Sequence, residues 1–250
     1  MPSDQAPLFF NPFAEKKQAQ HIKIECIAEK ELEDWQDKQT EERKAQIKEQ
    51  GFKAKSGETL IIREKGLINK IFAGYSDDAK FEDGAKIQSA ISKAFSKETL
   101  EKTTFELTNT PDEHAQRLSI GWGWACYKFN KYKKDKDNVY PQLCISGSLD
   151  VQRITTFVES VCLIRDLVNT PANDMGPDEL EEHADKLCAH HGVTLETIKD
   201  KELIKQNFPM VFDVGKASTR RPRLLDFSWG DEKHPTVTLV GKGVCFDTGG

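Results

Sequence analysis

Apolar and polar side chains change their spacing several times along the first half of the chain, and each spacing predicts an element. Residues 21–27 alternate polar and apolar side chains, which is typical of a strand with one buried face. Residues 85–95 carry apolar side chains at helical spacing. The predicted strands are residues 21–27, 59–62, 67–72, 103–107 and 143–146, and the predicted helices are residues 28–50, 85–95 and 110–129.

The second half continues this alternation of strands and helices. Ser148 is expected to cap a long helix that ends before Asn169, because Thr170 precedes a proline and such residues avoid the helical conformation. Another helix begins at Pro177, where a proline and two acidic residues suit a first turn, and ends at Gly192. The remaining predicted elements are strands at residues 193–198, 210–214, 223–228 and 237–240 and a short helix at residues 200–206.

This order of elements predicts an α/β fold. Strands that alternate with helices favour a mainly parallel sheet with helices on its faces. The length of 250 residues allows one large domain or two smaller ones. We therefore predict an N-terminal α/β domain over residues 1–150 and the start of a second α/β domain, with a mainly parallel sheet flanked by helices, over residues 151–250.

Charge and cysteine content narrow the class of protein. The net charge of −5 gives no general attraction for nucleic acid or anionic lipid. The six cysteines are scattered singly, which predicts reduced thiols rather than a disulfide framework or a zinc knuckle. Neither a secretory signal nor an apolar run of about 18 residues is visible. We expect a soluble cytoplasmic protein that binds neither nucleic acid nor membrane.

Two aromatic-rich segments are predicted to be structural. The basic run at residues 128–136 contains aromatic side chains, but interspersed aspartates make a solvated loop the better interpretation. The segment Gly121-Trp122-Gly123-Trp124 is predicted to pack in the core of the N-terminal domain rather than to form an aromatic recognition cage.

Candidate chemistry is concentrated in residues 236–250, TVTLVGKGVCFDTGG. Here the predicted strand 237–240 runs into a glycine-rich turn that carries Lys242 and Asp247. Ligands of open α/β sheets collect at the C-terminal ends of strands. Gly241 and Gly243 are expected to leave the backbone beside Lys242 open to an ion or a substrate.

Several interpretations of this segment compete. A P-loop is excluded, because position 236 is Thr rather than Gly and Gly243 follows Lys242 where Ser or Thr is required. A phosphate-binding Asp-Thr-Gly-Gly loop would leave Lys242 without a role. A metal site would use the carboxylate of Asp247 and the neutral amine of Lys242 as ligands to Zn²⁺ or Mn²⁺. A structural turn without chemistry is the remaining interpretation.

Four blocks of sequence bear on this choice. They are RDLVNTPANDMGP at residues 165–177, VGKAS at 214–218, PRLLDFSW at 222–229 and VGKGVCFDTGG at 240–250. In this order and with these gaps they closely resemble the leucine aminopeptidase (cytosol aminopeptidase) family. The resemblance covers about residues 148–250, and the first half of the chain resembles the family only loosely.

The resemblance implies a metal-dependent aminopeptidase that releases N-terminal amino acids, leucine among them, from peptide substrates. The family's metal-ligating lysine falls on Lys242, and the aspartate that bridges its two divalent ions falls on Asp247. Two ions, Mn²⁺ or Zn²⁺, together activate a water molecule in the family reaction. Family members assemble as homo-hexamers with the N-terminal domain on the outside.

The resemblance also places the remaining ligands, a second lysine and an arginine of the reaction centre downstream of Gly250. No catalytic residue is therefore expected within these 250 residues, which are expected to be inactive alone. Two alternatives of other classes stay open: a non-catalytic α/β module for ligand binding or assembly, and a nucleotide-dependent enzyme that uses the Asp-Thr-Gly-Gly loop.

Overall fold

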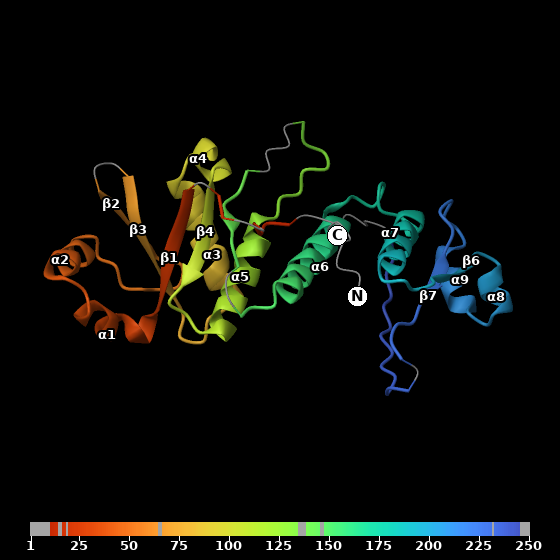
Figure 1. Cartoon of the computed structure of the whole chain (residues 1–250). Helices are drawn as coiled ribbons and strands as arrows, with labels where there is room; N and C mark the ends of the chain where they lie inside the picture. The colour runs from red at the N-terminus through yellow and green to blue at the C-terminus, as the bar shows by residue number, and fades with distance from the viewer. Residues whose placement is uncertain are drawn as a thin grey trace. The chain divides into compact units, whose positions relative to one another are not determined.

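The computed structural model describes residues 11–14, 17–18, 20–64, 67–134, 139–145, 148–231 and 233–245. Its contacts divide the chain into two compact units, Met1–Arg165 and Asp166–Gly250. Figure 1 shows the elements of each unit in chain order. The domain boundary predicted near residue 150 stays a prediction.

A five-stranded mixed sheet forms the centre of the first unit, with strand order β2-β3-β1-β4-β5. Its strands are β1 (Gln20–Ala28), β2 (Thr59–Glu64), β3 (Leu67–Tyr75), β4 (Thr103–Thr108) and β5 (Gln142–Leu143). Strand β1 pairs in parallel with β3 and β4, β4 pairs in parallel with β5, and only β2 runs antiparallel to its neighbour β3. The predicted α/β class with a mostly parallel sheet is confirmed.

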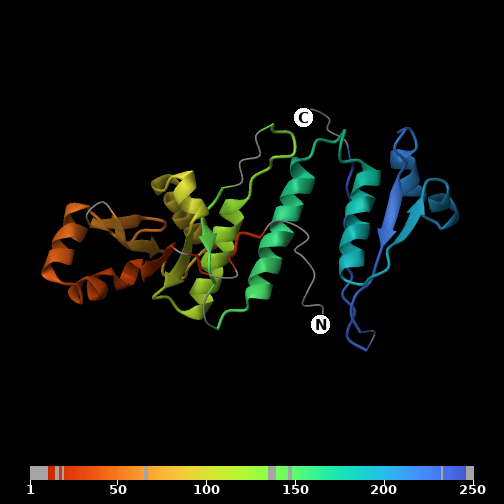
Figure 2. The same cartoon turned by 45° about the horizontal axis from the view of Figure 1, so that its top comes forward.

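The helices of the first unit cover both faces of this sheet (Figures 1 and 2). They are α1 (Leu32–Asp37), α2 (Glu41–Glu49), α3 (Phe81–Ala94), α4 (Lys97–Glu101), α5 (Asp112–Cys126) and α6 (Val151–Asn169), and a 3-10 turn, η1 (Glu29–Glu31), precedes α1. The single helix predicted over residues 28–50 is wrong. Thr40 adopts an extended conformation and its hydroxyl accepts from the backbone N–H of Arg43, so a new helix begins there.

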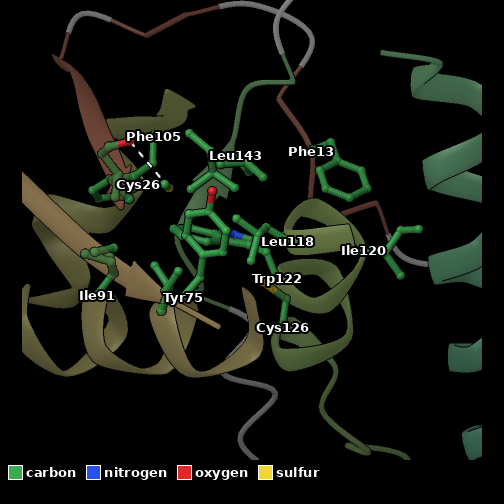
Figure 3. Close-up of a cluster of buried hydrophobic side chains, with 14 of the residues drawn as sticks. Phe13, Cys26, Tyr75, Ile91, Phe105, Leu118, Ile120, Trp122, Cys126 and Leu143 are labelled. Atoms are coloured by element: carbon green, nitrogen blue, oxygen red, sulfur yellow. Dashed lines mark hydrogen bonds between the residues drawn. The ribbon is translucent and has the colours of Figure 1, made fainter. Parts of the chain in front are cut away.

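Alternating side chains of β1 divide the core into two clusters. Ile24 and Cys26 pack on the face covered by α3, α5 and α6, whereas Ile27 packs on the face covered by α1 and α2. Figure 3 shows the larger cluster, in which Trp122 of α5 lies among side chains from the sheet and from α3. The indole N–H of Trp122 donates to the carbonyl of Pro141 at 3.0 Å, which satisfies its only polar atom.

The two glycines of the Gly-Trp-Gly-Trp segment set how closely helices approach α5. A Cβ on Gly121 would lie 1.8 Å from the carbonyl oxygen of Phe81 in α3. One on Gly123 would lie 2.6 Å from a methyl group of Val158 in α6. Trp122 is fully buried, which confirms core packing for that residue. Trp124 is only partly buried and contacts Phe81.

Helix α6 begins three residues later than its predicted cap. The carboxylate of Asp150 accepts from the backbone N–H of Arg153 at 2.9 Å, so Asp150 caps the helix, and Ser148 instead donates to Asp112. Ile154 and Val158 of α6 are fully buried against the first unit.

The second unit contains three helices and a strand pair among its described residues. Its helices are α7 (Pro177–His190), α8 (Glu202–Lys205) and α9 (Pro209–Gly215), and its strands are β6 (Glu196–Lys199) and β7 (Arg223–Asp226). The two strands pair antiparallel. The strand predicted at residues 210–214 is wrong, because Pro209 occupies the first position of helix α9. Met210 and Val214 of α9 are 76% and 67% exposed.

Candidate functional site

Lys242 lies in a stretch of the second unit that forms neither helix nor strand. The residue is exposed, as are its neighbours Gly241 and Gly243. A Cβ placed on either glycine would meet no atom within 4 Å. The space beside this backbone is therefore open among the described residues, as expected from the two glycines.

The strand predicted at residues 237–240 is wrong in the structure. Val237, Leu239 and Val240 are 81%, 91% and 90% exposed. A strand is stabilised by ladder hydrogen bonds to a neighbour and by burial of its side chains. No described strand pairs with residues 237–240, so their side chains have no neighbouring strand to pack against.

Asp247, the second implied metal ligand, lies outside the described residues, as do residues 246 and 248–250. The described segment thus supplies one implied ligand, Lys242. No cluster of three or more His, Cys, Asp or Glu side chains able to hold a metal occurs among the residues that the structure describes. These residues do not form a metal site by themselves, and the site of Lys242 and Asp247 stays a prediction.

A set of hydrogen bonds at the start of α7 lies ahead of the Lys242 segment in the chain. The backbone N–H of Gly176 donates to Glu179 at 2.8 Å, which closes the first turn of the helix. Arg220 donates to the carbonyls of Ala172 at 3.2 Å and Asn173 at 2.5 Å. A Cβ on Gly176 would lie 2.0 Å from the Arg220 guanidinium, so a larger residue would require this side chain to shift. Arg220 therefore joins the 171–176 turn to the chain that leads into β7.

A second arginine fixes strand β7 against α7. The Arg223 side chain is 6% exposed and forms ion pairs with Asp178, at 2.5 Å, and with Glu181. Lys199 of β6 also pairs with Glu181, at 2.7 Å. Burial raises the pKa of Glu181, but hydrogen bonds from Lys199 and Arg223 outweigh it and hold this pKa below its ordinary value. The carboxylate thus stays charged and ties both strands to the helix.

These two arginines are the residues that sequence analysis missed. Both stand in the run Arg220-Arg221-Pro222-Arg223; Arg220 lies between the blocks at residues 214–218 and 222–229, and Arg223 is the second residue of the latter. The available signal was this dense basic run together with the acidic residues of the first turn of α7. Opposite charges in two distant segments suggest that the segments meet, but they do not say which residues pair.

Cys245 behaves as a packing residue rather than as a nucleophile. It is partly buried, and burial raises the pKa of its thiol although the charges of Arg220 and Arg223 act to lower it. Burial likewise raises the pKa of Cys26 to about 12. All six cysteines are free thiols, which confirms that no disulfide framework is present. Within the described residues, no helix is both long and apolar enough to cross a bilayer.

Comparison with known proteins decides the family. The family model described as the M17 aminopeptidase N-terminal domain matches residues 22–144. The model described as the catalytic domain of the cytosol aminopeptidase family matches residues 162–250. The chain belongs to the cytosol aminopeptidase family.

Relatives of this aminopeptidase-family chain are longer than the chain itself. A probable cytosol aminopeptidase of Brucella anthropi is 30% identical over 219 residues, which cover 80% of this chain and 44% of that protein. One from Corynebacterium glutamicum is 35% identical over 139 residues, covering 52% and 28%. The chain spans about half the length of the curated relatives it matches.

Solved structures of the family share the fold. The cytosol aminopeptidase of Coxiella burnetii superposes with a TM-score of 0.78 at 33% identity, over 95% of this chain and 50% of that one. A tomato leucine aminopeptidase mutant superposes with a TM-score of 0.67 at 18% identity, over 94% and 53%. The α/β architecture of this chain is therefore the architecture of the family.

Proposed function

We propose that the protein containing this chain is an aminopeptidase that removes N-terminal amino acids of the leucine type from peptides. The observation that carries the proposal is the match of residues 162–250 to the family's catalytic domain, a match that includes the VGKGVCFDTGG block. The relatives described as probable cytosol aminopeptidases and the Coxiella burnetii structure support the same activity.

The proposed site uses Lys242 and Asp247 as ligands of two divalent metal ions. Bound ions would supply the activation of a water molecule and the polarisation of the scissile carbonyl. Manganese is one candidate, because the related bottromycin maturation enzyme BotP has been solved in complex with Mn. Zinc, which accepts both nitrogen and oxygen ligands, is the other.

The described residues contribute the base from which the Lys242 segment starts. Arg220 and Arg223 fix β7 and the 171–176 turn against α7, and the segment that carries Lys242 follows β7 in sequence. The amine of Lys242 must lose its proton before its nitrogen can donate to a metal. We also propose peptide substrates, a homo-hexameric assembly and a cytoplasmic location, none of which depends on the geometry above.

The test is a metal and activity measurement on the full-length protein. With leucine-p-nitroanilide as substrate and Mn²⁺ present, Asp247→Ala should abolish turnover, and Lys242→Ala should lower it heavily. Metal analysis of the purified variants should show loss of at least one bound ion per chain in each. Lys233→Ala is the matched control, because Lys233 is an exposed lysine of the same irregular stretch. Wild-type rates and metal content in both ligand variants would refute the proposal.

A further inference from the structure

An open cavity of about 620 Å³ lies in the first unit, away from the Lys242 segment along the chain. It is bordered by residues 78–85 at the start of α3, by Arg117, Trp124 and Ala125 of α5 and by Arg165 of α6, all within the first unit. Cavities of roughly 300–1,000 Å³ are typical of sites for small molecules. The Gly-Trp-Gly-Trp segment, to which the proposed function gives no role, contributes Trp124 to its wall.

The apolar part of the cavity is an aromatic wall. The rings of Phe81 and Trp124 lie 4.7 Å apart between centroids. They meet because Gly121 lets α5 approach the carbonyl of Phe81. Phe81 is 39% exposed, so its ring contributes apolar surface to the cavity. The indole nitrogen of Trp124 has no hydrogen-bond acceptor among the described residues. This nitrogen is itself buried, so the wall offers apolar surface to the cavity.

A fixed cation stands beside this wall. Arg165 donates to the carbonyl of Trp124 at 2.8 Å, and its guanidinium lies 5.4 Å from the centre of the Tyr127 ring. Within the described ranges, no carboxylate pairs with Arg165. Arg117 differs, because it pairs with Glu113 and donates to the carbonyl of Asp78 at 2.6 Å. Arg165 is therefore oriented but not neutralised.

Two carboxylates and a second cation also line this cavity. Asp78 and Glu82 are exposed, and neither carboxylate forms an ion pair with a described side chain. Lys80 stands between them in sequence and is equally unpaired among the residues described. Setting aside the neutralised Arg117, two anionic and two cationic groups remain. A ligand with a single charge would satisfy only one set, whereas a zwitterion satisfies both.

We propose that this cavity binds a small zwitterion with an apolar side chain, that is, a free α-amino acid or a short peptide. Arg165 receives the carboxylate, Asp78 and Glu82 receive the ammonium group, and the aromatic wall receives the side chain. The ligand class follows from the side chains that line the cavity. Its biological meaning rests on the proposed function, because an aminopeptidase releases such molecules.

The experiment is ¹⁹F NMR titration of the full-length protein with 4-fluoro-L-phenylalanine. Arg165→Gln should weaken binding at this cavity at least about tenfold, the effect of losing a charge-assisted hydrogen bond. Glu82→Gln, on the exposed first turn of α3, should also weaken it and leaves folding intact. Arg153→Gln is the control, because Arg153 lies exposed on the same helix α6 and outside the cavity. Unchanged affinity in both cavity variants overturns the proposal.

Matched ligands test the zwitterion itself. N-acetyl-4-fluoro-L-phenylalanine lacks the ammonium group and 4-fluoro-L-phenylalaninamide lacks the carboxylate, so each should bind at least about tenfold more weakly. Equal binding of either analogue overturns the zwitterion assignment. Lys242→Ala separates the cavity proposal from the proposed function. If this variant loses hydrolysis but still binds the amino acid in a way that depends on Arg165, both proposals are supported. Binding that depends on Arg165 in a protein without peptidase activity would refute the proposed function and leave the cavity proposal standing.

Discussion

Asp83 is a buried carboxylate whose replacement by asparagine should destabilise the first unit. It lies in the first turn of α3 and is 1% exposed. Its oxygens accept from the hydroxyls of Ser56 and Ser76 and from the backbone N–H groups of Ser76, at 3.2 Å, and Lys80, at 2.7 Å. One side chain thus joins the segment before β2, the end of β3 and the start of α3.

The size of the effect follows from this donor set. Asparagine keeps one acceptor oxygen but turns the other into an NH₂ group that faces donors. A hydrogen bond to a charged group contributes about 1.5–3 kcal/mol, and a donor left unsatisfied in the interior is destabilising by a similar amount. Loss of the Ser56 bond to Oδ1 and weakening of the three bonds to Oδ2 predict about 2–4 kcal/mol of destabilisation for Asp83→Asn.

The same carboxylate predicts a pH dependence. Burial raises the pKa of Asp83, but the hydrogen bonds from Ser56, Ser76 and the Lys80 backbone outweigh it, so its folded pKa lies below the ordinary value of 3.8. The unfolded chain therefore takes up a proton first as pH falls. The stabilisation is complete above the unfolded pKa and is lost as pH falls through the folded pKa. Asp83→Asn should remove this part of the acid sensitivity.

Urea unfolding of the intact protein at neutral pH and at several acidic values measures both effects. Hydrogen exchange of α3 amides assigns the transition to the first unit. The control is Asp34→Asn, because Asp34 is an exposed carboxylate of α1, where a change within about 0.5 kcal/mol is expected. A loss below about 0.5 kcal/mol in Asp83→Asn, or an unaltered acid slope, would show that the hydrogen-bond argument is wrong.

Three further outcomes test other contacts. Gly121→Ala should destabilise the first unit by about 2–4 kcal/mol in thermal unfolding, because its Cβ would lie 1.8 Å from the Phe81 carbonyl oxygen; an unchanged midpoint would contradict this packing. Arg223→Met should destabilise the second unit by about 1–3 kcal/mol and make its stability less dependent on salt, because Glu181 loses a largely buried partner. Cys26, with a pKa raised to about 12, should resist iodoacetamide at pH 8 until urea unfolds the protein; mass spectrometry that finds rapid alkylation in the native state would disprove its burial.

The spacing of apolar residues predicted strands of the first unit, because successive side chains of a strand such as β1 are buried on opposite faces of the sheet. The strand predicted at residues 21–27 became β1, whose neighbours Ile27 and Cys26 enter opposite cores. The predicted hairpin became β2 and β3. Composition misled where a cap interrupted a uniform charged run, as at Thr40, and where Asp150 rather than Ser148 caps α6. Strand order, by contrast, depends on contacts such as β1 with β4, which are far apart in sequence and leave no local signal.

The second unit shows the limit of the same reasoning. Residues 210–214 and 237–240 are both short apolar runs, and periodicity alone cannot separate a buried strand from a helix segment in such runs. Residues 210–214 form part of helix α9, whose first position is Pro209. Residues 237–240 have no partner strand among the described residues and are exposed, in neither helix nor strand. Lys242 follows this run directly, so its position depends on strand pairing that short-range pattern does not encode. The motif therefore predicts a chemistry for Lys242 without its geometry, and pairing of residues 237–240 with a neighbouring strand would be needed to fix the position of the amine.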